Sequence, residues 1–407
     1  NKVMVPDETG YELKRLNLTE QEAEEFYLGF SNKILWPLSH SFLEKSVLQN
    51  YQSCEKKWNF YKKVNKKYAD AILEEYTGDE LIWVHDYHLA LVPKIVREKH
   101  PEVNIAFFWH IPWPPWEIFG ALPWRKEILK SLCSSNFLGF HTTSYKENFS
   151  SCTEKLGLEK EVKISSSTGK AKTRVSSIPL GVNYDWFSSL AGKDKFKQEA
   201  ENLRKELTAD KIILGVDRLD YTKGIPQRLR AFEMFLEENP NFQEKVTLIQ
   251  RIPPSRTSAT EYESILKKIH MIVGEINGKF EKHNWTPIKS FHRFLPKQEQ
   301  LIPYYLAADI QLVTSLCDGM NLVSKEYIAT TDIGVLILSE FAGAAEELKE
   351  AIHVNPYNAR ETAQSIRKAL KMPLEEQREK MSKLKERVRK NDLMKWRDKF
   401  MKKWLND

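Results

Sequence analysis

The sequence of 407 residues contains no long hydrophobic run. Its longest apolar stretches, such as residues 334–338, are far shorter than the roughly 20 residues that a membrane-spanning helix needs. The sequence also shows neither the hydrophobic region of a secretory signal nor the composition of a transit peptide. We therefore expect no membrane-spanning segment and no membrane partner.

Cysteine is scarce, with only Cys54, Cys133, Cys152 and Cys317 present. No CxxC pair and no zinc-ligand spacing occurs among them, which argues against a disulfide scaffold and a structural zinc site. A disulfide between Cys133 and Cys152 is the alternative, but thiols buried in the core are the favoured interpretation.

The chain has only a small excess of positive charge. Its 62 Lys and Arg residues exceed its 56 Asp and Glu residues by six, which gives a formal net charge of +6. This surplus suits a protein that handles anionic small molecules. Acidic residues interrupt the basic ones in the segment 375–405, which favours a solvated helix with an apolar stripe over a nucleic-acid-binding arm. We expect no nucleic-acid partner.

Short apolar runs rich in β-formers alternate with longer amphipathic stretches almost from end to end. The runs are residues 81–84, 105–109, 137–140, 175–180, 212–216, 246–250, 288–291, 310–314 and 335–338. This alternation predicts an α/β protein whose parallel sheets are covered by helices on both faces. The polar, lysine-rich segment 184–210 separates two such series, and a new series begins at Lys211, which predicts two domains.

Polar motifs directly follow four of the predicted strands. The motifs are residues 85–88, 110–114, 217–224 and 318–322. Ligands of open parallel sheets bind outside the carboxyl ends of the strands, so we expect one site to which both halves contribute. Ordinary turn chemistry is the alternative, and four motifs in register make it the weaker one.

Arg218 and Lys223 lie on a predicted strand-to-helix loop, where Gly224 permits the turn and Pro226 suits the start of a helix. Two cations beside a helix N-terminus suit a phosphate or diphosphate. Taken alone, the pair is explained equally well as ordinary surface charge. The chain has no Asp-x-Asp, so we expect side-chain cations and backbone N–H groups to stabilise a leaving diphosphate.

Asp318 and Glu326 place two carboxylates eight positions apart. Gly319 lets the backbone approach a ligand, and Asn321 and Leu322 open a predicted helix whose amides point at an anion. Glu326 follows within that helix, at a distance that suits a ribose hydroxyl.

Asp86 stands between His85 and His88, a pattern compatible with a metal cluster. Histidines at i and i+3 beside a strand end are more often hydrogen-bonding groups, and this is the favoured interpretation. Trp36 and Trp113 suit stacking on the face of a sugar, although core packing is favoured for each one alone.

Five segments have a distinctive order and spacing: LIWVHDYHLALVPK, FFWHIPWPPWEIFGALPWR, GVDRLDYTKGIPQRL, DGMNLVSKEY and VLILSEFAGAAEEL. Together they resemble the trehalose-6-phosphate synthases of glycosyltransferase family 20. The resemblance implies an α/β fold of the GT-B type, with two Rossmann-like doubly wound domains and the active site in the cleft between them. It implies an acceptor-binding domain over residues 1–183, a nucleotide-sugar-binding domain over 184–387, and a C-terminal helix over 388–407. That helix would pack back on the first domain through Trp396 and Phe400.

The resemblance also implies a reaction. A synthase of this family is a retaining glucosyltransferase that moves glucose from UDP-glucose to glucose 6-phosphate, giving α,α-trehalose 6-phosphate and UDP by a front-face mechanism. No cofactor or metal is expected. The implied partners are the two substrates, a trehalose-phosphate phosphatase in the same pathway and a second copy in a homo-oligomer, in the cytoplasm.

Roles for individual residues follow from the same resemblance. Donor binding is implied for His110, Arg218, Lys223, Leu295, Asp318, Gly319, Met320, Asn321, Leu322 and Glu326. Acceptor binding is implied for Tyr27, Trp36, Asp86 and Arg256, and catalysis for Asp86, His110, Arg218, Lys223 and Asp318. In this scheme the two cations hold the diphosphate, Glu326 binds the ribose, and Phe294 and Leu295 form the wall of the uracil pocket.

Two departures from the family pattern bear on acceptor choice and activity. Residues 1–20 do not match the expected first strand and glycine-rich loop, so that segment is expected ahead of Asn1, and Cys317 stands where many relatives have Arg. One alternative is therefore a glucosylglycerol-phosphate synthase, which uses glycerol 3-phosphate as acceptor. Another is a sugar-phosphate-binding regulator without activity.

Overall fold

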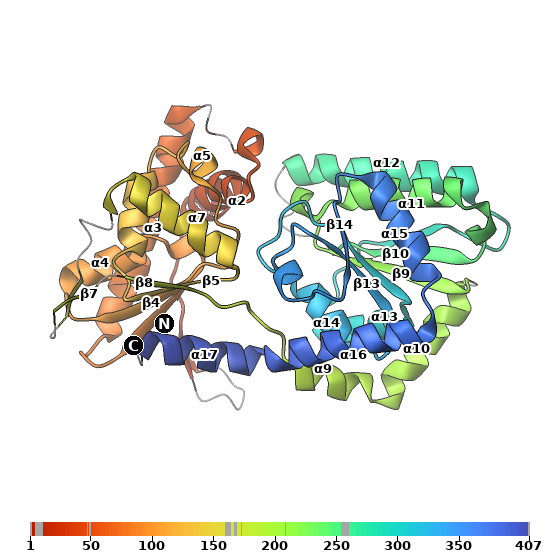
Figure 1. The fold of residues 1–407 in the computed structure, drawn as a ribbon. Helices are drawn as coiled ribbons and strands as arrows, with labels where there is room; N and C mark the ends of the chain where they lie inside the picture. Colours follow the sequence, from red (N-terminus) through yellow and green to blue (C-terminus); the bar gives the residue numbers. More distant parts are fainter. Residues whose placement is uncertain are drawn as a thin grey trace. The chain divides into compact units, whose positions relative to one another are not determined.

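A computed structural model describes residues 2–4, 11–46, 48, 50–158, 164–166, 169–171, 173–207, 209–253 and 260–405. The chain forms two compact units. The N-terminal unit comprises Asn1–Ile178 with Phe400–Asp407, and the C-terminal unit comprises Pro179–Lys399. Each unit contains a parallel sheet with helices packed on it (Figure 1).

The C-terminal unit has a six-stranded parallel sheet. Its strands are β9 (Lys211–Val216), β10 (Val246–Arg251), β11 (Ile288–Phe291), β12 (Ile310–Val313), β13 (Val335–Ser339) and β14 (Ile352–Val354). The order across the sheet is β11-β10-β9-β12-β13-β14, and every neighbouring pair is parallel. The order of a doubly wound sheet reverses between its first and fourth strands, so this unit has a topological switch point between β9 and β12.

Helices cover both faces of this sheet because its strands are apolar on both sides. Ile212 and Leu214 of β9 belong to one buried cluster, and Ile213 belongs to the other. The first cluster includes side chains of α9 (Tyr184–Ala191), α10 (Asp194–Leu207), α13 (Ile302–Ala307), α14 (Leu322–Thr330) and α16 (Leu374–Lys390). The second includes side chains of α11 (Ile225–Glu238), α12 (Thr260–Phe280) and α15 (Ala359–Leu370). The predicted continuous apolar strands of a doubly covered sheet are confirmed.

The N-terminal unit is built on a four-stranded parallel sheet with the order β3-β4-β5-β8. These strands are β3 (Leu81–His85), β4 (Asn104–Phe108), β5 (Phe137–Phe140) and β8 (Arg174–Ser177). Its α-helices are α1 (Glu20–Glu22), α2 (Trp36–Ser39), α3 (Tyr51–Glu75), α4 (Val92–Lys99), α5 (Trp116–Phe119), α6 (Arg125–Leu132) and α7 (Thr143–Lys155). Two antiparallel pairs were not predicted: β1 (Lys2–Met4) with β2 (Glu12–Lys14), and β6 (Ile164–Ser166) with β7 (Gly169–Ala171).

The described residues also form shorter helical turns. The 3₁₀ turns are η2 (Leu43–Lys45), η3 (Tyr87–Leu89), η4 (Tyr221–Lys223), η5 (Pro240–Phe242), η6 (Gln298–Leu301) and η7 (Gly343–Glu346). A π-helix, η1 (Ala23–Leu35), runs for 13 residues, although such helices are usually single turns found near functional sites. The Asn32 amide supports η1 by donating to the Tyr27 carbonyl (2.6 Å) and accepting from the Tyr87 hydroxyl (2.9 Å).

The segment 375–405 is not one long helix, and that prediction is wrong. Helix α16 ends at Lys390 and α17 (Leu393–Leu405) begins three residues later. The Asp392 carboxylate accepts from the Lys395 backbone N–H (2.8 Å), and the Leu393 N–H donates to the Val182 carbonyl (3.0 Å). A Cβ at Gly181 would collide with the Asn391 carbonyl. The break in the helix therefore accommodates the passing chain at 181–182.

The end of α17 packs within the N-terminal unit. The Phe400 ring stacks on Trp83, with centroids 4.4 Å apart, and also contacts Phe108 and Phe137. The Trp404 indole N–H donates to the Asn104 side chain (2.7 Å). This aromatic contact, like the helix break, depends on residues far apart in the sequence.

All four cysteines lie in the described part of the chain and remain thiols. Cys54, Cys133 and Cys152 are buried, which confirms the favoured interpretation for them, whereas Cys317 is half-buried. Within the described residues, no helix is both long and apolar enough to cross a membrane.

We expect Phe400→Ala to destabilise the protein by about 3–5 kcal/mol, because it removes a fully buried ring from an aromatic cluster and leaves a cavity. Urea denaturation followed by tryptophan fluorescence measures this loss. Lys402→Ala, an exposed position on the same helix, is the control and should change the stability by less than about 0.5 kcal/mol. Equal stabilities of the two variants would contradict the assigned packing.

Candidate functional site

The loops that follow β9 and β12 meet at the switch point of the C-terminal sheet. The Leu316 N–H donates to the Thr222 carbonyl (2.7 Å), and the Thr314 hydroxyl donates to the Gly224 carbonyl (3.1 Å). Gly224 has φ +62°, and a Cβ there would collide with the Thr314 carbonyl. Glycine is therefore required at the predicted turn, and α11 begins at the next residue, Ile225, as predicted.

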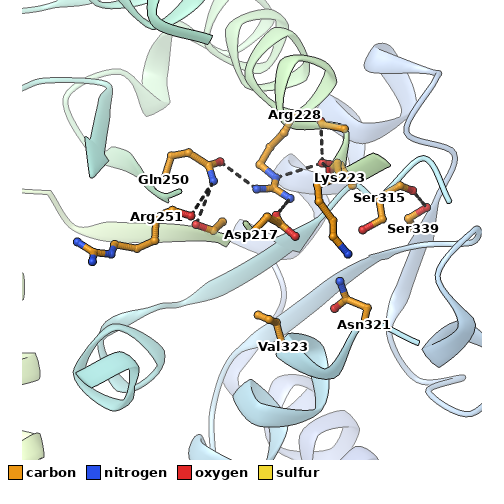
Figure 2. Close-up of polar contacts among 12 residues, drawn as sticks. Asp217, Lys223, Arg228, Gln250, Arg251, Ser315, Asn321, Val323 and Ser339 are labelled. Atoms are coloured by element: carbon orange, nitrogen blue, oxygen red, sulfur yellow. Dashed lines mark hydrogen bonds and ion pairs between the residues drawn. The ribbon is translucent and has the colours of Figure 1, made fainter. Parts of the chain in front are cut away.

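Lys223 and Asp318 join these two loops through a largely buried ion pair. The Lys223 Nζ lies 2.6 Å from the Asp318 Oδ2, which also accepts from the Ser315 hydroxyl (3.1 Å) and the Asn321 amide (3.0 Å). Burial opposes the ammonium charge, but the attraction of Asp318 and Asp217 prevails and raises the pKa of Lys223. Lys223 is therefore cationic at neutral pH, and its ammonium group is directed toward Asn321 (Figure 2).

A second ion pair, between Arg228 and Asp217, adjoins the first and was not predicted. Arg228 is completely buried and donates to Asp217 (2.5 Å) and Gln250 (2.9 Å), as Figure 2 shows. It also donates to the Thr314 hydroxyl (3.1 Å). Burial raises the pKa of Asp217, against the opposing effect of Arg228. The sequence signal was available, because Arg228 occupies a position between Ile225 and Leu229 on the buried face of an amphipathic helix.

Arg218 is the exposed cation of this loop. Among the described residues no side chain forms a hydrogen bond or ion pair with its guanidinium, and its charge acts on Lys223. An exposed guanidinium beside a buried ammonium is the arrangement expected for binding an anion such as a diphosphate.

The segment from Asp318 to Leu322 leads into helix α14, as predicted. Asn321 adopts a left-handed conformation (φ +72°) and caps the helix by accepting from the Ser324 N–H (3.1 Å). Main-chain bonds hold the preceding residues, because the Gly343 N–H donates to the Asp318 carbonyl (3.0 Å) and the Ala344 N–H to the Met320 carbonyl (2.8 Å). The first amides of α14 form the positive end of its dipole.

Glu326 lies one turn further along α14 and is buried. Its carboxylate accepts from the Tyr305 hydroxyl and from the Gln298 amide, both at 2.7 Å. Burial raises the pKa of Glu326, while these two donors oppose the shift. Each carboxylate oxygen has a second lone pair, so a ribose hydroxyl is compatible with these contacts.

The loop after β11 carries Phe294 and Leu295. Phe294 is 67% exposed, whereas Leu295 is half-buried and lines a pocket of about 630 Å³ between α10 and this loop. The role of these two residues as a wall for a nucleotide base stays a prediction.

In the N-terminal unit, Asp86 follows β3 in a strained backbone conformation. Its φ of 71° and ψ of 159° lie in a region that is almost restricted to glycine. The Asp86 N–H donates to the Phe108 carbonyl (2.8 Å), and its carboxylate accepts from the Tyr87 N–H (2.9 Å). These bonds hold the carboxylate at the carboxyl end of the sheet.

His110 follows β4 and lies beside His85. The Nε2 of His110 and the Nδ1 of His85 share a hydrogen bond of 2.9 Å, and the His141 ring bonds to the His110 carbonyl (3.1 Å). Burial, together with His141 and His85, lowers the pKa of His110 to about 2. His110 is therefore neutral at physiological pH.

The structure does not assemble the alternative metal cluster. His85 bonds to His110, and the nearest approach of His88 to Asp86 is 3.8 Å. In the described ranges of the chain, no three His, Cys, Asp or Glu side chains are grouped to hold a metal ion.

The remaining predicted residues differ in exposure. Tyr27 is 42% exposed and stacks on the His88 ring, with centroids 5.4 Å apart. Trp36 is buried against Tyr87, and Trp113 is buried in the core, as favoured for each taken alone. Arg256 lies outside the described residues.

Residues 1–406 match the family described as glycosyltransferase family 20. The chain belongs to this family. It is 41% identical over 397 residues to the bifunctional trehalose-6-phosphate synthase/phosphatase of Thermoproteus tenax, covering 96% of this chain and 53% of that protein. It is 40% identical over 421 residues to an α,α-trehalose-phosphate synthase (UDP-forming) of Arabidopsis thaliana, covering 100% of this chain and 44% of that protein. The chain thus spans about half the length of these curated relatives.

Solved family structures share the fold. An E. coli structure bound with UDP-2-fluoro glucose matches with a TM-score of 0.90 and 34% identity, over 99% of this chain and 88% of that one. A Burkholderia xenovorans α,α-trehalose-phosphate synthase in complex with glucose-6-phosphate matches with a TM-score of 0.86 and 32% identity, over 95% and 85%. The predicted GT-B fold is confirmed.

A buried lysine of the family motif was also missed as a structural residue. Lys325 donates to the Leu180 carbonyl (2.7 Å) and pairs with Glu347, whose other oxygen accepts from Asn391 (3.0 Å). Burial lowers the pKa of Lys325. Lys325 therefore ties α14 to the chain at 180 and to the break between α16 and α17, all within the C-terminal unit.

We expect Asp86→Gly to be more stable than Asp86→Ala by about 1–2 kcal/mol, because glycine relieves the strained backbone at some cost in chain entropy. Both variants lose the same carboxylate, so their difference isolates the backbone conformation. Urea denaturation of the two proteins measures it. An Asp86→Ala variant at least as stable as Asp86→Gly would show that the strain is absent.

Protein stability should fall as the pH drops below about 6.5, by up to about 1.4 kcal/mol per pH unit from His110 alone. The unfolded chain takes up a proton on this ring near pH 6.5, whereas the folded protein does so only near pH 2. His110→Gln should therefore lose less stability between pH 7 and 5 than the wild type, measured by urea denaturation at each pH. His283→Gln, at an exposed position, is the control. The same pH slope in His110→Gln and wild type would refute the assignment.

Proposed function

We propose that this chain transfers glucose from UDP-glucose to the anomeric hydroxyl of glucose 6-phosphate, with retention, and releases UDP and α,α-trehalose 6-phosphate. The observation that carries the proposal is the cation pair Arg218 and Lys223 beside the start of α14 at the switch point of a Rossmann-type sheet. Membership of glycosyltransferase family 20 and the relatives named above support the choice of substrates.

In this proposal the C-terminal unit binds the donor. Arg218, Lys223 and the first amides of α14 neutralise the diphosphate as it gains negative charge. Residues 318–322 hold the glucose and its phosphate, and Glu326 accepts from a ribose hydroxyl. The uracil lies against the loop that carries Leu295.

The N-terminal unit supplies the acceptor groups in the same proposal. The Asp86 carboxylate, fixed by the strained backbone, orients sugar hydroxyls of the acceptor. Tyr27 and Trp36 contact its 6-phosphate, and Arg256, from the chain range of the C-terminal unit, adds a cation to the same phosphate. The neutral ring of His110 contacts the donor glucose as a hydrogen-bonding group.

Transfer then proceeds on one face of the sugar. The bond from the glucose C1 to the phosphate oxygen breaks, and its electron pair leaves with UDP. The acceptor hydroxyl oxygen forms the new bond to C1, and its proton passes to the departing phosphate oxygen. Asp318 is a poor candidate for a covalent nucleophile, because three donors already engage one of its oxygens. Positioning and charge stabilisation therefore supply the rate.

We expect Arg218→Ala to lower kcat/KM for UDP-glucose by about 100-fold or more, because it removes a cation from the leaving diphosphate. The fold should persist, since Arg218 is exposed and its guanidinium forms no hydrogen bond or ion pair with a described side chain. The measurement is UDP release with glucose 6-phosphate as acceptor. Arg230→Ala, at a half-buried arginine of α11 that pairs with Glu233 and Glu275, is the control and should retain activity.

The acceptor is tested by repeating the UDP-release assay of the full-length protein with glycerol 3-phosphate. Turnover with glucose 6-phosphate, giving a non-reducing disaccharide phosphate, supports the proposal. Turnover only with glycerol 3-phosphate would replace it with a glucosylglycerol-phosphate synthase. UDP-glucose binding without turnover on either acceptor would indicate a regulator.

A further inference from the structure

Arg251, at the end of β10, is a buried cation without a described carboxylate partner. The residue is 4% exposed, and no acidic side chain in the described ranges forms an ion pair with it. Its Nε has no hydrogen-bond partner among the residues that the structure describes. Burial lowers the pKa of Arg251. Burying a charge without a carboxylate is costly, so the residue calls for an explanation other than stability.

The side-chain contacts of Arg251 lead to the end of β11, to the loop that follows it and to α13. Its Nη2 donates to the main-chain carbonyl of Arg293 (3.2 Å), and its Nη1 makes a long contact with the Tyr304 hydroxyl (3.5 Å). The guanidinium carbon lies 5.3 Å from the Phe291 ring centre and 5.0 Å from that of Tyr304. The Arg251 side chain thus contacts residues near both ends of the segment 291–304.

Arg251 is distinct from the cations that face the diphosphate. In Figure 2 its guanidinium points away from Arg228 and from Lys223. Gln250 nevertheless connects Arg251 to Arg228. Its amide oxygen accepts from the Arg228 guanidinium (2.9 Å), and its amide nitrogen donates to the Arg251 carbonyl (3.5 Å). The scaffold that fixes the phosphate loop therefore also fixes the backbone from which Arg251 projects.

We propose that Arg251 is a positioning residue for the base of the donor nucleotide. By bonding to the Arg293 carbonyl, two residues before Leu295, it fixes the loop whose wall the base contacts. This inference rests on the proposed function, because Leu295 is assigned to the base there. A lysine cannot replace the residue fully, because it lacks the planar fork that donates to a carbonyl while also contacting two aromatic rings.

A second property of the loop reports on Arg251 directly. Burial, the neighbouring His270 and the charge of Arg251 together lower the pKa of His292. The His292 Nε2 lies 2.9 Å from the Ser290 hydroxyl and 3.2 Å from the His270 Nε2. Removing the guanidinium charge should therefore raise the pKa of His292, which NMR titration of the histidine ring detects.

The decisive test compares two ligands on the full-length protein. Calorimetry should show that Arg251→Met weakens UDP binding by about tenfold while the binding of inorganic pyrophosphate changes by less than about twofold. In turnover, KM for UDP-glucose should rise by a similar factor with little change in kcat. Arg251→Lys, which keeps the charge, should fold normally and show an intermediate loss for UDP alone. Arg230→Met is the matched control and should bind both ligands like the wild type.

Each other outcome overturns the proposal in a distinguishable way. UDP binding of Arg251→Met and Arg251→Lys equal to that of the wild type would refute the role of Arg251 and leave the proposed function intact. Equal weakening of UDP and pyrophosphate would show that Arg251 supports the whole unit rather than the base loop. A wild-type protein that binds pyrophosphate but not UDP would overturn the donor assignment of the proposed function, and this inference with it.

Discussion

The buried guanidinium of Arg228 is the constraint on which the candidate donor site depends. It bonds to groups at the carboxyl ends of three neighbouring strands: Asp217 after β9, Gln250 in β10 and Thr314 after β12. Removing one member of such a network leaves a buried charge or polar group unpaired, which is more costly than the network's net contribution to stability. The loop that presents Arg218 and Lys223 begins at Asp217, so its position follows from this interaction.

Charge in the two units is arranged in opposite ways. At the switch point of the C-terminal sheet, carboxylates keep Lys223 cationic despite its burial, and Arg218 remains exposed. At the end of the N-terminal sheet, burial keeps His110 neutral. A fixed cation suits a leaving diphosphate, whereas a neutral ring suits hydrogen bonding to a sugar without repelling nearby cations. Two Rossmann-type sheets thus carry different chemistry because their loops differ in charge and burial.

Two residues beside the candidate sites are held in energetically unfavourable states. Asp86 adopts a backbone conformation that disfavours any side chain, and Arg251 buries a charge without a described carboxylate. Both are held by main-chain contacts, to the Phe108 carbonyl and the Arg293 carbonyl respectively. Costs of this kind persist only where the surrounding structure enforces them, and they concentrate where groups must be held for a ligand.

The sequence by itself determined the fold class and the local positions of the candidate residues. Apolar runs without polar alternation indicated strands buried on both faces, and Gly224 and Asn321 marked the starts of α11 and α14, because these signals depend only on neighbours along the chain. Only the tertiary structure decided which groups meet. The bond of Arg228 to Gln250, the break at Asn391 and the contact of Arg251 with the Arg293 carbonyl each join residues distant in sequence. No local pattern encodes such pairings, because they arise from strand order and close packing across the sheet.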